Sequence, residues 1–155
     1  MDITLEQYTG SHRDLEWSFR AADDSQELLD TYIDLGLLWV ARAADGEVIG
    51  HLQVVPRDEE VWDVTNTAVV ESQRGRGAGR ALLERAVDEA RAAGVRRMIV
   101  ATGAADVGNL RFYQRCGFRM TRVVKDVFTP VNGYPAGLEV DGIPLLDQVW
   151  FERVL

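Results

Sequence analysis

Residues 73–80 (QRGRGAGR) form a glycine- and arginine-rich segment with the composition of an anion-binding site. Glycine has no Cβ, so its backbone takes positive φ angles easily and approaches a ligand closely. Successive backbone N–H groups in such a segment, placed before a helix, form a nest for an anion. Three arginines, Arg74, Arg76 and Arg80, add positive charge. The segment therefore predicts a pyrophosphate-binding site, and a glycine-rich turn without a ligand is the alternative.

Two common phosphate-binding motifs do not fit this segment. The P-loop requires a lysine followed by serine or threonine after its last glycine, and neither is in place here. The dinucleotide fingerprint requires G-x-G-x-x-G, whereas Gly75, Gly77 and Gly79 alternate, so the third glycine comes too early. A nucleotide-phosphate binder that uses the glycine segment alone remains an alternative function.

A strand before the segment and a helix after it must position these groups. Residues 60–70 are rich in Val, Thr and Trp, a composition typical of strands. In residues 80–93 the apolar side chains share one helix face, and Gly94 is a typical helix stop. The sequence therefore predicts a strand–loop–helix unit around the anion site.

The remaining elements follow from periodicity and from turn residues. Strands are predicted at 3–7, 37–42, 47–55, 60–70, 95–101, 118–127 and 146–154, and helices at 12–22, 25–35, 80–93 and 107–115. This order indicates the α/β class (α+β), with a mixed sheet in a single domain over residues 1–155. Residues 130–146 contain several prolines and glycines and are expected to be mostly loop. A loop of this length indicates a functional or subunit-contacting segment, and a homodimer is left open.

Composition excludes several other classes of protein. Hydrophobic residues make up 46% and charged residues 27% of the 155, which is typical of a soluble globular protein. We expect no membrane association, because no apolar run approaches the roughly 18–20 residues that span a bilayer. The N-terminal residues lack the pattern of a signal peptide, and the single cysteine, Cys116, fits the cytoplasm. Two histidines and one cysteine, far apart, predict no metal site.

Charge is distributed unevenly along the chain. The formal net charge is −8, yet residues 64–125 carry 12 basic and 5 acidic side chains. This basic segment indicates an anionic ligand, whereas the overall acidity argues against nucleic acid as a partner. Asp23, Asp24 and the acidic residues after them are expected to form a solvated helix face. The alternative is that they attract a cationic, polyamine-like substrate.

Two segments together resemble the signatures of the GNAT family of N-acetyltransferases. Residues 74–79 (RGRGAG), followed by Ala-Leu-Leu, resemble the coenzyme A signature Q/R-x-x-G-x-G/A. Residues 112–118 (FYQRCGF) resemble the second signature, an aromatic residue or Leu, then Tyr, three residues and Gly-Phe. The resemblance covers residues 39–120 well and both termini weakly. It implies a coenzyme-A-binding core at about 60–120 and a C-terminal loop and strand at 128–155. The run 102–120 is similar to that of a bacterial subgroup.

The resemblance implies an enzyme that transfers an acetyl group from acetyl-coenzyme A (acetyl-CoA). The acceptor would be the amine of a small molecule or peptide, which attacks directly in a ternary complex without a metal. In this family the strand before the loop separates from its parallel neighbour and pairs with the pantetheine arm, and an N–H near Ala68 or Val69 polarises the thioester carbonyl. The residues assigned to cofactor binding are Thr67, Ala68, Val69, Arg74, Gly75, Arg76, Gly77, Ala78, Gly79, Arg80, Asp106 and Asn109.

The resemblance also implies the residues that move protons. Tyr113 is the expected general acid for the departing thiolate, because a phenol near pKa 10 can share a proton with a thiol near about 8.5. The alternative is that Tyr113 only packs in the core. Asp63 is the expected general base, directly or through a water, unless it only attracts a cationic substrate. Glu60, Glu139 and Asp147 are the other candidates for the base.

One position departs from the family pattern. Many relatives have an asparagine seven residues before the tyrosine, where it contacts the pantetheine arm, and this chain has Asp106 there. The bacterial subgroup has an asparagine two residues earlier, at Ala104, and Asn109 is the candidate substitute. The departure leaves open a second function, a non-catalytic acyl-CoA-binding or regulatory module of the same fold.

Overall fold

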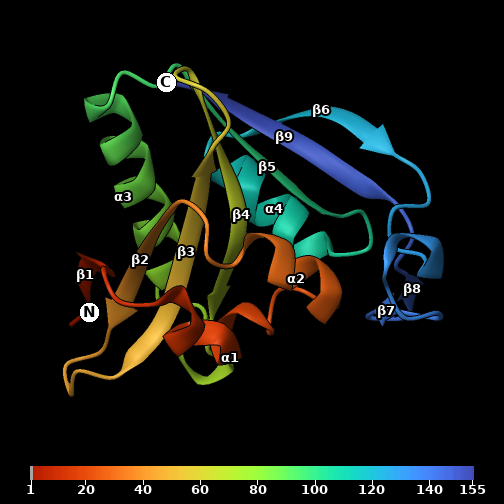
Figure 1. Cartoon of the computed structure of the whole chain (residues 1–155), viewed down its shortest axis with the longest axis horizontal. Coiled ribbons are helices and arrows are strands. Elements are labelled where there is room, and N and C mark those ends of the chain that lie inside the picture. The colour runs from red at the N-terminus through yellow and green to blue at the C-terminus, as the bar shows by residue number, and fades with distance from the viewer. Residues whose placement is uncertain (1) are drawn as a thin grey trace.

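The computed structural model, which describes residues 2–155, is built around a seven-stranded mixed sheet (Figure 1). Its strands are β1 (Thr4–Gln7), β2 (Leu37–Arg42), β3 (Val48–Pro56), β4 (Val61–Val69), β5 (Arg97–Gly103), β6 (Arg119–Val124) and β9 (Gln148–Val154). The strand order is β1-β2-β3-β4-β5-β9-β6, and β4 and β5 are the parallel pair among antiparallel neighbours. The prediction of a mixed α/β sheet is confirmed.

Four α-helices flank the sheet, and three of them depart from their predicted bounds. They are α1 (Glu16–Phe19), α2 (Gln26–Tyr32), α3 (Ala78–Ala92) and α4 (Val107–Arg115). The single helix predicted at 12–22 is instead a 3-10 turn, His12–Leu15, followed by the short α1. Helix α2 ends three residues earlier than predicted. Helix α3 begins two residues earlier than predicted, because Gly77 adopts the left-handed conformation of its N-cap.

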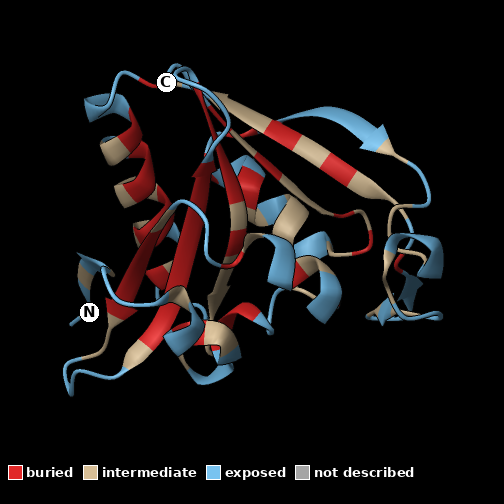
Figure 2. Cartoon of the chain, viewed as in Figure 1, coloured by how far each residue is buried: buried red, intermediate tan, exposed pale blue. Residues whose placement is uncertain are grey.

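Buried side chains form two clusters, one on each face of the sheet. Strand β2 shows the alternation, since Trp39 and Ala41 join the cluster under α3 and α4. Leu38 and Val40 join the other cluster, under α1 and α2. Figure 2 shows β2, β3 and β4 as the most buried strands, whereas the edge strand β6 is exposed.

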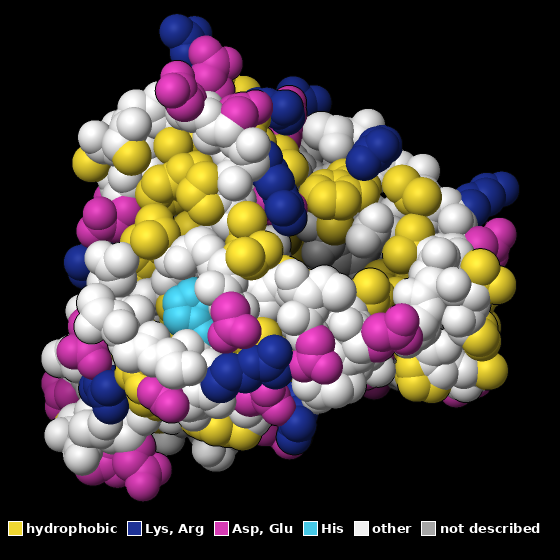
Figure 3. Space-filling view, viewed as in Figure 1, with side chains coloured by type: hydrophobic (Ala, Val, Ile, Leu, Met, Phe, Trp, Pro, Cys, Tyr) yellow, Lys and Arg dark blue, Asp and Glu magenta, His cyan; other side chains and the backbone are white. Residues whose placement is uncertain are grey.

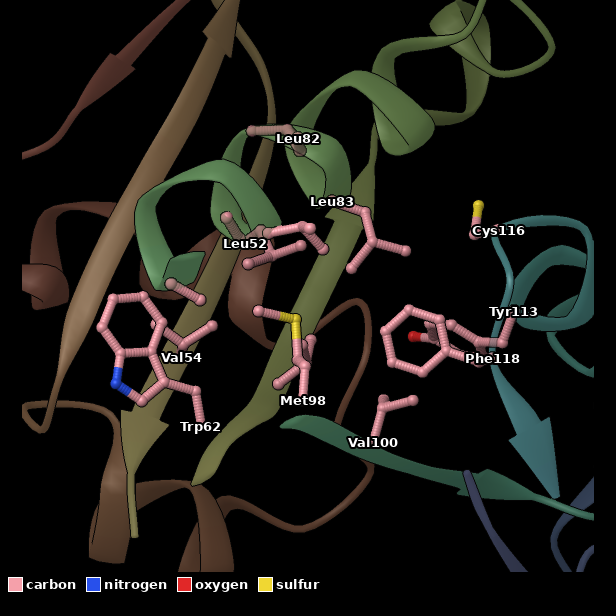
Figure 4. Packing of buried hydrophobic residues seen from close by; sticks show 14 of the residues in the cluster. Leu52, Val54, Trp62, Leu82, Leu83, Met98, Val100, Tyr113, Cys116 and Phe118 are labelled. Carbon is pink, nitrogen blue, oxygen red and sulfur yellow. The ribbon is translucent and has the colours of Figure 1, made fainter. Parts of the chain in front are cut away.

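The larger cluster joins α3 and α4 to the sheet. Figure 4 shows Leu82 and Leu83 of α3 above side chains of β3 and β4, with Tyr113, Cys116 and Phe118 at their side. Each of these five side chains is at most 4% exposed. The cluster therefore fixes both helices relative to β4 and β5, between which the candidate site lies.

The segment after β6 is mostly loop, as predicted. It contains a 3-10 turn (Pro130–Asn132) and the two-residue strands β7 (Glu139–Val140) and β8 (Ile143–Pro144). The loop folds back on the α1–α2 face, where the Ser25 hydroxyl donates to the Gly133 carbonyl across 2.8 Å. Across residues 2–155, the helices are too short or too polar to cross a membrane.

Candidate active site

Strands β4 and β5 separate halfway along their length. They pair in parallel from Val61 opposite Arg97 to Val64 opposite Val100, and the pairing then stops. Strand β4 continues along β3 to Val69, and β5 continues along β9 to Gly103. Residues 65–69 of β4 therefore have an unpaired edge on the β5 side, and this edge lines a gap in the sheet.

A bulge in β4 coincides with the start of the gap. Gln53 of β3 lies opposite Asn66, but the next β3 residue, Val54, lies opposite Val64. Thr65 is thus the extra residue of the bulge. A bulge bends its strand and increases the local twist, which turns the rest of β4 away from β5.

The backbone of Val69 faces the gap. The Val70 N–H donates to the Ile49 carbonyl of β3, and the direction of backbone groups alternates along a strand. The N–H and C=O groups of Thr67 and Val69 therefore point away from β3, whereas those of Ala68 point toward it. Of the two positions predicted for the polarising N–H, Val69 has its N–H on the side of the gap, whereas the N–H of Ala68 points toward β3.

The glycine-rich segment and the start of α3 follow the C-terminal end of β4, next to the gap. Gly75 and Gly77 have φ angles of 78° and 87°, which favour glycine. Gly77 caps α3 without a side chain, and the first turn carries no acidic residue. The first N–H groups of a helix have no partner within it, so those of Ala78, Gly79 and Arg80 are available to a ligand. A Cβ at Gly75 meets no atom within 4 Å, so the segment leaves space for an anion.

Three exposed arginines surround this helix start. Nε of Arg74 donates to the Val69 carbonyl across 3.0 Å, and Arg76 Nη1 lies 3.3 Å from Oε1 of Gln73. Arg80 forms no ion pair among the described residues. A nest of N–H groups ringed by cations, next to the gap, has the electrostatics that a pyrophosphate requires.

Tyr113 of α4 packs in the core, and its hydroxyl makes no hydrogen bond among the described residues. Its ring contacts Phe112, Phe118 and Phe151, and the residue is 4% exposed. Among residues 2–155, the Trp39 indole nitrogen is the one completely enclosed polar side-chain atom without a hydrogen-bond partner. The Tyr113 hydroxyl, which also has no partner, is therefore nearly but not completely enclosed. Burial raises the pKa of Tyr113 above its usual value, so the phenol stays protonated.

Asp63 lies on β4 just before the gap and is 6% exposed. Its Oδ2 accepts hydrogen bonds from Nε and Nη2 of Arg57, at 3.0 and 2.7 Å. Burial raises the pKa of Asp63, and the Arg57 guanidinium opposes that shift in part. A carboxylate with a raised pKa is a better base near neutral pH, but this one is also half of an ion pair.

The other candidates for the base have structural partners or lie on the surface. Glu60 lies 3.4 Å from Arg96 in an exposed ion pair. Asp147 accepts from the Asp126 N–H across 3.0 Å, which ties the C-terminal loop to β9. Glu139 is exposed on β7.

Asp106 and Asn109 both form hydrogen bonds at the start of α4. The Asp106 carboxylate caps the helix by accepting from the Asn109 N–H across 3.0 Å. The Asn109 side chain donates to the Thr102 hydroxyl of β5, also across 3.0 Å. Asn109 is thereby joined to the β5 side of the gap, while Asp106 fixes the helix.

Figure 3 shows a hollow in the surface above α2 in this view, on the face that carries α1 and α2. Oδ2 of Asp23 accepts a hydrogen bond from the Tyr32 hydroxyl across 2.6 Å. The pKa of Tyr134 is raised, mainly by burial and further by the negative charges of Asp23 and Asp24. Burial and the adjacent Asp23 also raise the pKa of Asp24. This end of the acidic stretch thus differs from its helical part, where Arg13 pairs with Asp30 and Asp34.

Three polar residues near the site, Gln53, Thr65 and Asn66, were not predicted from the sequence. They are hydrogen-bonded around the bulge. The available signal was the polar run Thr65-Asn66-Thr67 within an otherwise apolar strand. His51 is a buried histidine with both ring nitrogens hydrogen-bonded, since Nδ1 bonds Ser18 and Nε2 bonds Asn66. No group of three or more potential metal ligands occurs among residues 2–155.

The family model described as Acetyltransferase (GNAT) family matches residues 5–118. The uncharacterized N-acetyltransferase YvbK of Bacillus subtilis is 30% identical over 128 residues, which is 83% of this chain and 81% of YvbK.

Two solved structures show the same arrangement over nearly the whole chain. A GNAT family acetyltransferase from Elizabethkingia anophelis with acetyl-CoA bound has a TM-score of 0.90 and 30% identity, covering 99% of both chains. A Bacillus subtilis acetyltransferase in complex with CoA has a TM-score of 0.87 and 27% identity, again covering 99% of both chains.

Proposed function

The chain belongs to the GNAT family of acetyltransferases, and we propose that it moves the acetyl group of acetyl-CoA to the amine of a small molecule or peptide. One observation carries the proposal. The gap that begins at Val64 and Val100 has the free edge of β4 on one side and the α3 helix start at its end. A donor with a long polar arm and a pyrophosphate fits that combination.

We assign the donor to this gap residue by residue. The pantetheine arm pairs with the backbone of Thr67 and Val69, and the side chain of Ala68 packs beside it. The pyrophosphate binds the N–H groups of residues 75–80. The Val69 N–H donates to the thioester oxygen and stabilises the negative charge that develops there, a contribution of about 3–4 kcal/mol in comparable sites.

The reaction is a direct attack of the amine in a ternary complex. The amine lone pair forms a bond to the thioester carbonyl carbon, and the C–S bond then breaks. Tyr113, whose raised pKa keeps its phenol protonated at neutral pH, donates this proton to the sulfur as the C–S bond breaks. Asp63, through a water, accepts the proton that the amine loses. Both products then leave uncharged at the reacting atoms, and Asp63 returns its proton to solvent while the Tyr113 phenolate takes one up, which restores both groups.

The acceptor enters from the α1–α2 face. Asp23 and Asp24 lie close enough to Tyr134 to affect its pKa, and acidic and aromatic side chains on this face favour an amine that carries positive charge. The acidic face and the basic donor site lie on opposite sides of the sheet, so each attracts a substrate of the opposite charge. We expect the enzyme to act in the cytoplasm, and a homodimer stays a prediction.

Calorimetry and an amine screen test the proposal. Acetyl-CoA should release heat on binding, and ATP should not displace it. A screen of aminoglycosides, polyamines, amino acids and peptide N-termini, with detection of free thiol, then identifies the acceptor. A folded protein that gives no heat with acetyl-CoA refutes the proposal.

A second candidate function is a non-catalytic acyl-CoA-binding module. The Arg57–Asp63 ion pair favours it, because a carboxylate held by a guanidinium is a weaker base. That module would bind acetyl-CoA but release no thiol with any amine of the screen.

A further inference from the structure

Gln53 of β3 is fully buried and links the end of α2 to β4. Its Nε2 lies 2.9, 3.1 and 2.9 Å from the carbonyl oxygens of Tyr32, Ile33 and Leu35, respectively. Carbonyl oxygens only accept, so this end of the amide is the donor and the orientation of Gln53 is fixed. Its Oε1 therefore faces β4, where the Thr65 hydroxyl donates to it across 2.6 Å.

Thr65 is the residue at which β4 leaves β5. It is the extra residue of the bulge, and the parallel pairing ends at its neighbour Val64. The bond to Gln53 thus acts on the first residue of the unpaired edge. A bulge without such a bond is free to shift along the strand, and that shift would move every backbone group after it.

The next residue, Asn66, is held from the same face. Its Nδ2 lies 3.1 Å from the Phe19 carbonyl and 3.0 Å from the Tyr32 hydroxyl, while Oδ1 accepts from Nε2 of His51 at 2.7 Å. Asn66 is 4% exposed and His51 is fully buried. Well-satisfied buried polar networks make a local geometry unique rather than merely stable.

We propose that Gln53 and Thr65 are positioning residues, which set the place of the Val69 N–H relative to the thioester carbonyl. The inference rests on the proposed function, in which that N–H polarises the carbonyl. Val69 lies four residues beyond Thr65 on the unpaired edge, which has no β5 partner to hold it. Displacement of a hydrogen-bond donor by about 1 Å is enough to weaken such a contact strongly.

The test compares Thr65→Val with Thr65→Ser. Valine keeps the shape of threonine but removes the donor, whereas serine keeps the hydroxyl. The readout is the infrared carbonyl stretch of acetyl-CoA labelled with carbon-13 at the thioester, bound to saturation. The wild-type protein should lower this frequency, Thr65→Val should retain less than about half of the shift, and Thr65→Ser should retain nearly all of it.

Thr121→Val is the matched control. The Thr121 hydroxyl also makes a hydrogen bond, to the Trp150 carbonyl at 3.3 Å, but it lies on the exposed edge strand β6. This variant should keep the full carbonyl shift. If Thr65→Val fails to fold, Thr65→Ala carries the same test.

The outcomes separate the inference from the proposed function. If Thr65→Val is less stable yet keeps the whole shift, the bond to Gln53 is only structural and the inference is overturned. A wild-type complex with no shift overturns it as well. If wild-type protein gives no heat with acetyl-CoA, the proposed function itself fails.

Discussion

Nε of Arg74 donates to the carbonyl of Val69 across 3.0 Å, which ties the glycine-rich segment to the last residue of β4. The carbonyl and the N–H of Val69 face the same gap, so this bond connects the proposed pyrophosphate site to the proposed site of the thioester. Arg74 is exposed, so the bond itself contributes little to the stability of the fold. We expect the bond instead to place the pyrophosphate and the thioester of bound acetyl-CoA relative to each other.

Arg74→Ala should weaken the binding of acetyl-CoA by about tenfold, because it removes a cation beside the pyrophosphate and the tie to Val69. The midpoint of thermal unfolding should change by less than about 2 °C. Arg91→Ala removes an equally exposed arginine at the other end of α3 and is the control. Titration calorimetry measures both, and equal affinities for the two variants would remove Arg74 from the donor site.

Tyr113→Phe should lower kcat by roughly a hundredfold and leave KM for acetyl-CoA nearly unchanged, because the ring still packs while the proton donor is lost. Steady-state rates with the acceptor from the amine screen measure this. An unchanged kcat across pH would mean that water protonates the thiolate.

The raised pKa of Tyr113 also predicts an alkaline effect on stability. Its phenol stays protonated in the folded protein at a pH where the unfolded chain already ionises, above about 10. The stability that this group contributes is therefore present below pH 10 and is lost above it. Tyr113→Phe should lose less stability than the wild type between pH 9 and 11 in urea unfolding. If the free energy of unfolding falls equally in both proteins, the alkaline effect comes from other tyrosines.

Asp63→Asn should lower kcat by at least tenfold if Asp63 is the base. Arg57→Gln provides the sharper comparison, because it leaves the carboxylate but removes the guanidinium that lowers its pKa. The acid limb of the pH–rate profile should then move to higher pH. An acid limb that stays in place for Arg57→Gln, with full activity of Asp63→Asn, would assign the base to another group.

His51 should make the fold sensitive to mild acid. Burial lowers its pKa to about 4, against the ordinary value of about 6.5, so below pH 6.5 the unfolded chain binds a proton that the folded protein does not. The stability contributed by neutral His51 is present above pH 6.5 and is lost as the pH falls toward 4. The wild type should lose about 2 kcal/mol more than His51→Gln between pH 7 and pH 5. Urea unfolding at both pH values measures the difference, and equal losses would contradict the buried neutral histidine.

The sequence predicted the elements that depend on local patterns. Helix α4 has its predicted bounds, Val107–Arg115, and β2 has its predicted bounds, Leu37–Arg42. Apolar periodicity defines both because it reports which side chains face the core over a few neighbouring turns or pleats. The helix predicted at 12–22 was wrong in its extent, because a capped 3-10 turn and the bend before Ser25 replace most of it.

The sequence by itself thus determined the family and its donor, acetyl-CoA, because the glycine-rich segment and the segment around Tyr113 are contiguous motifs that can be read without the fold. The tertiary structure alone decided where β4 leaves β5, that Val69 rather than Ala68 faces the gap, and that Asp63 is paired with Arg57. These features depend on strand pairing and on contacts between distant residues. A register shift of one residue reverses which groups face a partner strand, and nothing in the local sequence of β4 fixes that register.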